Sequence, residues 1–74
     1  MTRFATHTLS VTVNGVPQTL DAGTTVADLL VRMDAAGRRV AVERNGEIVP
    51  KSRHGETRLA DGDRLEIVIA VGGG

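Results

Sequence analysis

The sequence predicts an α+β domain in which a mixed sheet of about five strands carries one helix on one face. Three observations support this class. Short runs of alternating apolar residues, typical of strands, lie near both ends of the chain. One run between them has the apolar spacing of an amphipathic helix. Two Asn-Gly pairs, at residues 14–15 and 45–46, indicate tight hairpin turns.

Length and composition exclude several classes of function for this protein. The chain has 74 residues, and we expect residues 1–74 to form a single small domain of modest stability. Its formal net charge of zero disfavours an electrostatic nucleic-acid binder, and the lack of cysteine excludes disulfides and thiolate chemistry. No apolar run approaches the roughly 18 residues of a membrane span, and no signal-peptide pattern is present, so we expect no membrane partner. These features predict a cytoplasmic protein.

The first hairpin is predicted from residues 8–20. In residues 8–13 the apolar side chains alternate with polar ones, as in a half-buried strand. Asn14-Gly15 follows, and both residues tolerate the positive φ angles of a two-residue hairpin turn. The returning strand, residues 16–20, contains Pro17. Because proline cannot donate to a sheet ladder, this strand is expected at an edge of the sheet.

A helix is predicted to begin after Thr25. The Thr25 hydroxyl is placed to accept a hydrogen bond from the backbone N–H of Asp28, and the Asp28 carboxylate to reach back, in a variant of the capping box. Gly37 is predicted as the left-handed residue that closes the helix. The apolar residues fall on one helical face: Val26, Leu29, Leu30 and Met33.

The next segment predicts a second hairpin. Residues 40–42 are interpreted as a short strand buried on both faces, and Asn45-Gly46 returns the chain through residues 47–49. A polar loop at residues 51–56 follows. After it, a brief turn is predicted to bury Leu59.

The last strand is predicted from Arg64 to Val71, after a tight turn at residues 61–63. It is apolar on one face and partly apolar on the other, where Val68 and Ala70 lie. A strand of this kind is usually central in its sheet. The order of elements places the first and last strands side by side and parallel, in the β-grasp, or ubiquitin-like, arrangement. Val68 and Ala70 then lie on the face that no helix covers.

Three glycines, Gly72, Gly73 and Gly74, follow this strand. Since glycine has no Cβ and loses much freedom when ordered, we expect a flexible tail over about residues 72–74. Three extended residues reach roughly 10 Å beyond the strand. Such a tail suits a narrow channel in another protein. The α-carboxylate of Gly74 is a poor electrophile until it is activated, most simply as a mixed anhydride with AMP; a sulfur nucleophile then gives a thiocarboxylate.

The other candidates for chemistry are weaker. His54 lies near Glu56, but no nucleophile or cleft accompanies the pair, so we interpret His54 as a solvated loop residue. His7 is interpreted in the same way. The two histidines match no metal-ligand spacing, and residues 61–63 lack the remaining ligands of a calcium loop. We therefore expect neither an enzyme nor a metal site.

Three segments resemble the sulfur carrier proteins of the ThiS family of thiamine biosynthesis. They are TVADLL at residues 25–30, VERNGEIVPKS at 42–52, and LADGDRLEIV at 59–68, followed by the terminal glycines. The resemblance covers roughly residues 9–74. The middle segment together with the diglycine end is its most specific part.

The resemblance implies a carrier and not an enzyme. Gly74 would be adenylated by an E1-like enzyme of the ThiF type, which uses ATP. It would then become a thiocarboxylate with sulfur from a donor such as a cysteine desulfurase, and would pass the sulfur to a thiazole synthase of the ThiG type. No cofactor is bound by the carrier itself. Gly73 and Gly74 match the family's diglycine, whereas His54 replaces an aromatic residue and residues 1–8 form an extension.

Partner binding is assigned to Val68, Ala70 and Val71. Two alternatives stay open. A sibling carrier that serves molybdopterin, cysteine or another metabolite would share the fold and the tail. A ubiquitin-like binding module would use the same sheet face but would not need a free Gly74.

Overall fold

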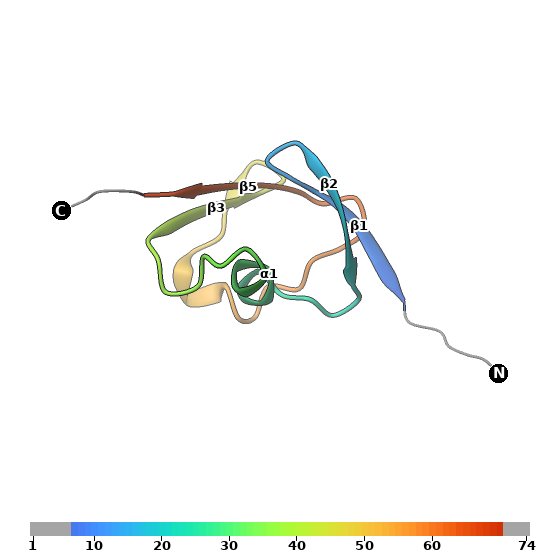
Figure 1. The fold of residues 1–74 in the computed structure, drawn as a ribbon, viewed down its shortest axis with the longest axis horizontal. Coiled ribbons are helices and arrows are strands. Elements are labelled where there is room, and N and C mark those ends of the chain that lie inside the picture. The colour runs from blue at the N-terminus through green and yellow to red at the C-terminus, as the bar shows by residue number, and fades with distance from the viewer. Residues whose placement is uncertain (1–6, 71–74) are drawn as a thin grey trace.

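The computed structural model describes residues 7–70, which form one mixed sheet with one α-helix on a single face (Figure 1). The sheet order is β2-β1-β5-β3-β4; β1 and β5 are parallel and the other neighbours antiparallel. This arrangement confirms the predicted α+β class and β-grasp fold. The elements are β1 (Thr8–Val13), β2 (Val16–Asp21), α1 (Val26–Arg32), β3 (Val40–Arg44), β4 (Glu47–Ile48), the 3-10 helix η1 (Lys51–Arg53) and β5 (Arg64–Ile69).

The β1–β2 hairpin forms as predicted. Its turn residues Asn14 and Gly15 have φ angles of 51° and 82°, and Val13 pairs directly with Val16. Pro17 lies in β2 at the edge of the sheet, where its missing N–H breaks no ladder. His7 is exposed, as expected from its place before β1.

Helix α1 begins with the predicted capping box. The Asp28 N–H donates to Thr25 Oγ1 at 3.1 Å, and the Thr25 N–H donates to Asp28 Oδ2 at 3.0 Å. These bonds satisfy two of the N–H groups that the first turn leaves free. The buried face of the helix then packs on the sheet.

The predicted role of Gly37 is wrong. The helix ends at Arg32, and Asp34, with a φ angle of 59°, is the left-handed residue. The Asp34 N–H donates to the Val31 carbonyl at 3.0 Å and the Ala35 N–H to the Leu30 carbonyl at 2.8 Å, which is the Schellman pattern. Because Ala35 is completely buried, its burial fixes the end of the helix before Gly37 is reached.

The core lies between α1 and the sheet and is aliphatic. β3 contributes only one face to it: Val42 is buried but Ala41 is exposed, so the prediction of a strand buried on both faces is wrong. Leu59 is buried as predicted. The buried apolar residues are Val11, Val13, Leu20, Val26, Leu29, Leu30, Ala35, Val42, Leu59, Leu65 and Ile67.

Candidate functional site

The predicted site residues lie at the end of the central strand β5 and beyond it. Ala70 lies just beyond this strand and its N–H donates to the Arg39 carbonyl at 2.9 Å. Val68 lies within the strand. Val71, Gly72, Gly73 and Gly74 lie outside the described residues. The structure thus describes the strand that leads to the predicted tail.

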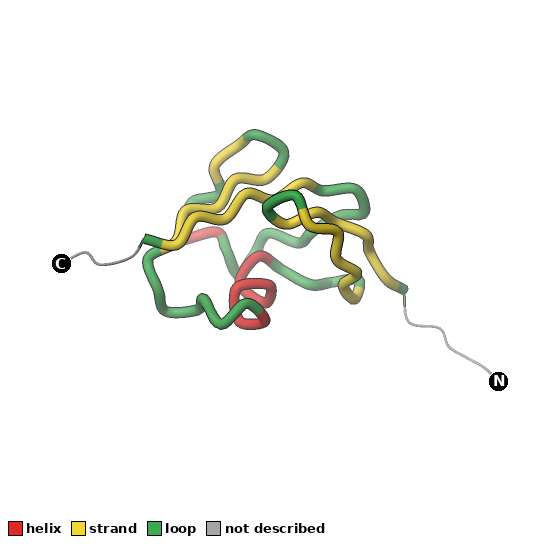
Figure 2. Tube along the Cα trace, turned by 45° about the horizontal axis from the view of Figure 1, so that its top comes forward, coloured by secondary structure: helices red, strands yellow, loops and turns green. Residues whose placement is uncertain are grey.

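The face of the sheet opposite α1 carries an apolar patch. Val68 is 65% exposed, and its direct partner on β3 is Ala41, also exposed. On β4, Ile48 is 64% exposed and lies opposite Glu43, on the same face. Figure 2 shows α1 on the other side of the strands. The sequence indicated Val68 and Ala70 on this face, but it missed Ala41 and Ile48 because the β3–β5 register was not known. We call Ala41, Ile48, Val68 and Ala70 the open-face patch.

Asn14 fastens β5 from the β1 side. Its side chain accepts a hydrogen bond from the Ile67 N–H at 2.7 Å and donates to the Ile67 carbonyl at 3.0 Å. The Asn14 backbone N–H also donates to the Leu65 carbonyl at 2.8 Å. The side-chain amide therefore extends the hydrogen bonding between β1 and β5 by one position, although the backbone at Asn14 already turns toward β2.

Replacing Asn14 with glycine should lower the free energy of unfolding by about 2 kcal/mol, since two hydrogen bonds of about 1 kcal/mol each are lost. Glycine keeps the positive φ angle of the turn, so the change reports on the side chain alone. Urea unfolding measures the effect. Gly15→Ala is the matched test of turn strain, and an unchanged stability of Asn14→Gly would contradict this role.

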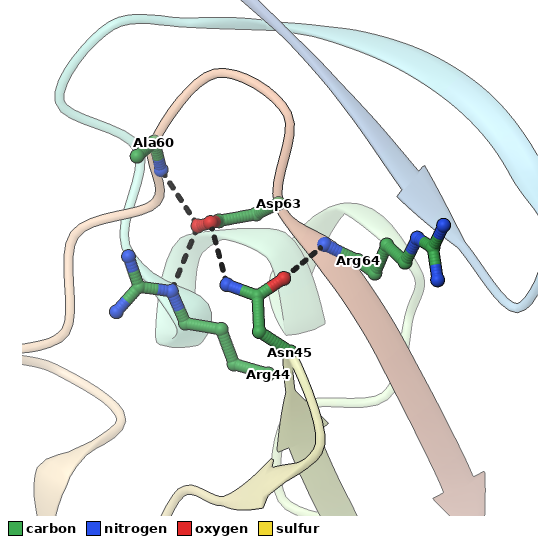
Figure 3. A network of polar contacts seen from close by, with 5 residues as sticks. All are labelled: Arg44, Asn45, Ala60, Asp63 and Arg64. Carbon is green, nitrogen blue, oxygen red and sulfur yellow. Dashed lines mark hydrogen bonds and ion pairs between the residues drawn. The ribbon is translucent and has the colours of Figure 1, made fainter.

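Asp63 fastens the start of β5 (Figure 3). This side chain is buried and accepts three hydrogen bonds: from the Ala60 N–H at 2.7 Å, from Arg44 Nε at 2.8 Å and from Asn45 Nδ2 at 3.0 Å. The Asn45 Oδ1 atom accepts from the Arg64 N–H at 2.9 Å. The second Asn-Gly turn thus holds β5 from the β3 side, as the first holds it from the β1 side.

The electrostatics of Asp63 follow from these contacts. Burial acts to raise the pKa of the Asp63 carboxyl, but hydrogen bonds from Ala60, Asn45 and Arg44, with the charge of Arg44, outweigh it and hold the pKa below its ordinary value. The carboxylate is therefore ionised and paired at neutral pH. It serves the fold of the turn before β5, and the sequence suggested only a tight turn there.

The interpretation of His54 as a solvated loop residue is wrong. Its side chain is buried, with Nε2 at 3.1 Å from the Val49 carbonyl oxygen, and its own carbonyl accepts from the Ala27 N–H at 2.9 Å. The neighbouring residues of η1 are polar, so the sequence did not indicate that this segment packs beside α1. Glu56 does not pair with His54: its Oε1 atom lies 3.8 Å from Nη1 of Arg53, and both side chains of this ion pair are exposed.

Two further findings concern residues 7–70. No group of three or more histidine, aspartate or glutamate side chains in this part of the chain is arranged to hold a metal ion. Within the same residues, no helix has the length and apolar character that crossing a membrane requires.

Comparison with known proteins places this geometry in a family. The ThiS family model matches residues 11–74. The sulfur carrier protein ThiS of Bacillus subtilis is 48% identical over 54 residues, which cover 73% of this chain and 80% of that protein. A crystal structure of the thiamine biosynthesis protein ThiS of Geobacter metallireducens has a TM-score of 0.73 at 36% identity, over 89% of this chain and 100% of that one.

A longer relative is also similar. The thiazole synthase of Paramagnetospirillum magneticum is 46% identical over 66 residues, which cover 89% of this chain. The chain spans only 20% of that protein's length.

The fold and the central strand leading to a glycine run define a ubiquitin-like protein of β-grasp architecture. With the family match over residues 11–74, the chain belongs to the ThiS family.

Proposed function

We propose that this chain is a sulfur carrier in thiamine biosynthesis, and that the carboxyl group of Gly74 carries the sulfur as a thiocarboxylate. The supporting observation is the family match, which runs through Gly72, Gly73 and Gly74 and joins the chain to a relative named as a sulfur carrier protein. The chain is then a substrate of other enzymes and supplies the acyl group on which they act.

The proposed chemistry takes place on the terminal acyl carbon. A carboxylate oxygen of Gly74 attacks the α-phosphorus of ATP in an E1-like enzyme, which gives an acyl adenylate and pyrophosphate. A desulfurase takes sulfur from cysteine as an enzyme persulfide, and the terminal sulfur of this persulfide attacks the acyl carbon and expels AMP, which gives an acyl disulfide. A thiol reductant then cleaves the S–S bond and frees the acyl-bound sulfur. The product is the thiocarboxylate. Its sulfur atom is the nucleophile that a thiazole synthase needs.

The described residues support this role by fixing the base of the tail. β5 is central in the sheet and is held by Asp63 at its start, by Asn14 at Ile67 and by Arg39 at its end. Because the exit direction of the tail is fixed, less conformational entropy is lost when an enzyme binds the tail.

The proposed partners follow from the same chemistry. The similarity to a segment of a thiazole synthase supports an interaction with that enzyme. An E1-like enzyme of the ThiF type and a cysteine desulfurase complete the set. Because activation needs ATP, we place the reaction in the cytoplasm.

The intact mass of the protein from sulfur-replete cells tests the proposal. We expect a species heavier by one oxygen-to-sulfur exchange, which fragmentation assigns to Gly74. Cells that lack the adenylating enzyme are the control and should give only the unmodified mass. An unmodified chain in both cell types would overturn the proposal.

The open-face patch is proposed to contact the enzymes that receive the tail. Val68→Asp should weaken binding to the thiazole synthase about tenfold, because a carboxylate would have to be desolvated within an apolar contact. The melting temperature should change little, since Val68 is 65% exposed. Calorimetric titration measures the affinity, with Glu66→Asp on the same strand as the control. Equal affinities for Val68→Asp and the wild type would remove this face from the interface.

A further inference from the structure

A second concave surface lies on the helix side of the sheet, away from the open-face patch. It is a hollow of about 290 Å³ between the end of α1, the start of β3 and η1. Apolar side chains form much of its wall, among them Leu30, Val31 and Ala36, and Val31 is 65% exposed. An exposed valine beside a hollow of this size marks a surface suited to a partner's apolar side chain.

The hollow is built by the fold. The Schellman turn buries Ala35, and the Arg38 N–H then donates to the Ala35 carbonyl at 3.2 Å, which shapes one wall. Lys51 and His54, at the two ends of the η1 segment, form the opposite wall. Because both walls are fixed by backbone hydrogen bonds, the hollow exists before a partner arrives.

The rim carries positive charge. Arg38 and Lys51 are exposed and are the charged side chains among the described residues that line the hollow. His54 lines it as well and is only 7% exposed. Since the Val49 carbonyl can only accept, this hydrogen bond requires a proton on Nε2 of His54. A partner segment that complements this basic rim and apolar wall has an apolar side chain with a carboxylate next to it.

The position of the hollow relates it to the tail. Val40 lines the hollow and pairs with Ile69 at the end of β5, and the Arg39 carbonyl accepts the N–H of Ala70. A protein that receives the residues after Ala70 therefore comes close to the hollow. The open-face patch lies on the other side of the same strand.

We infer that this hollow is a docking site for the thiazole synthase, which seats there an apolar side chain flanked by a carboxylate. The inference rests on the proposed function. With the open-face patch, it lets the enzyme hold the end of β5 from both sides of the sheet. Contacts on both sides would orient the tail more strictly than contacts on one.

Calorimetric titration of the full chain with the thiazole synthase of the same organism tests this site. Ala36→Trp fills the mouth of the hollow from an exposed position, and Arg38→Glu with Lys51→Glu reverses the charge of its rim. We expect each variant to weaken binding about tenfold or more. Arg58→Glu, at the opposite end of α1 beside Thr25, is the control for one charge reversal and should bind within about twofold of the wild type.

Circular dichroism and thermal unfolding establish that the variants are folded. If Ala36→Trp and the double variant both bind like the wild type, the docking site is wrong while the sulfur-carrier proposal stands. If they bind weakly but the chain never acquires the sulfur mass, the docking site stands and the sulfur-carrier proposal fails. Weakening by Arg58→Glu equal to that of the double variant would show a general charge effect and would also overturn the site.

Discussion

Removal of Gly74 should abolish activation of the chain by its E1-like partner, with a rate loss of at least about 100-fold. The reason is geometric: the acyl carbon would stop one residue, about 3.3 Å, short of its position in the enzyme. Misplacement of a reacting group by about 1 Å already costs on the order of 100-fold. ATP–pyrophosphate exchange with the purified partner measures the rate. The melting temperature should not change, because the core is formed by residues between Val11 and Ile67.

A chain with one extra glycine at its amino terminus is the control and should be activated normally. A chain with one extra residue after Gly74 should be inactive as well. This second variant separates a carrier from a ubiquitin-like binding module, since a binding module tolerates the addition. Normal activation of the truncated chain would disprove the role of Gly74.

Asp63→Ala should be the most destabilising of the substitutions proposed, lowering the free energy of unfolding by about 3 kcal/mol. The change leaves Arg44, Asn45 and the Ala60 N–H without the carboxylate that joins them, and Asp63 is only 5% exposed. A domain of this size has roughly 4 to 10 kcal/mol of total stability. The melting temperature should therefore fall by roughly 15 °C. Asp61→Ala, in the same turn but exposed, is the control and should cost less.

The same carboxylate predicts a pH dependence. The pKa of Asp63 in the folded protein lies below its ordinary value. Its ionised form therefore stabilises the fold above the unfolded pKa of about 3.9, and this contribution is lost as the pH falls through the lower, folded-state pKa. Asp63→Asn should be less stable than the wild type at pH 7, and its stability should decline less toward acid. Urea unfolding at several pH values gives both slopes, and parallel slopes would contradict the prediction.

Local patterns predicted the elements of the fold well. The alternation in β1, the proline in β2 and the capping box of α1 each depend on residues a few positions apart, and all three are confirmed. The central place of β5 also followed from its apolar face and its partly apolar second face. These features are properties of single segments, which the sequence displays directly.

Contacts between distant segments were not predictable in the same way. The Asn14 side chain reaches a strand 53 residues later, and the Asp63 carboxylate joins a turn to residues 18 and 19 positions earlier. The burial of His54 depends on how the segment that contains η1 packs against α1, which the sequence alone does not show. The helix end moved from Gly37 to Asp34 because of the burial of Ala35 in the core. For the tail, family resemblance supplied what packing rules could not.

The hydrogen bonds that the side chains of Asn14 and Asn45 make to β5 also have a mechanical consequence. An enzyme that draws the last residues into its active site applies a load along the axis of β5. The ladder bonds to β3 lie across that axis, and the Asn14 amide adds two more on the other edge. Under such a load these bonds are sheared together and do not open one after another. This shear geometry favours an intact domain when the chain is pulled from its carboxyl end.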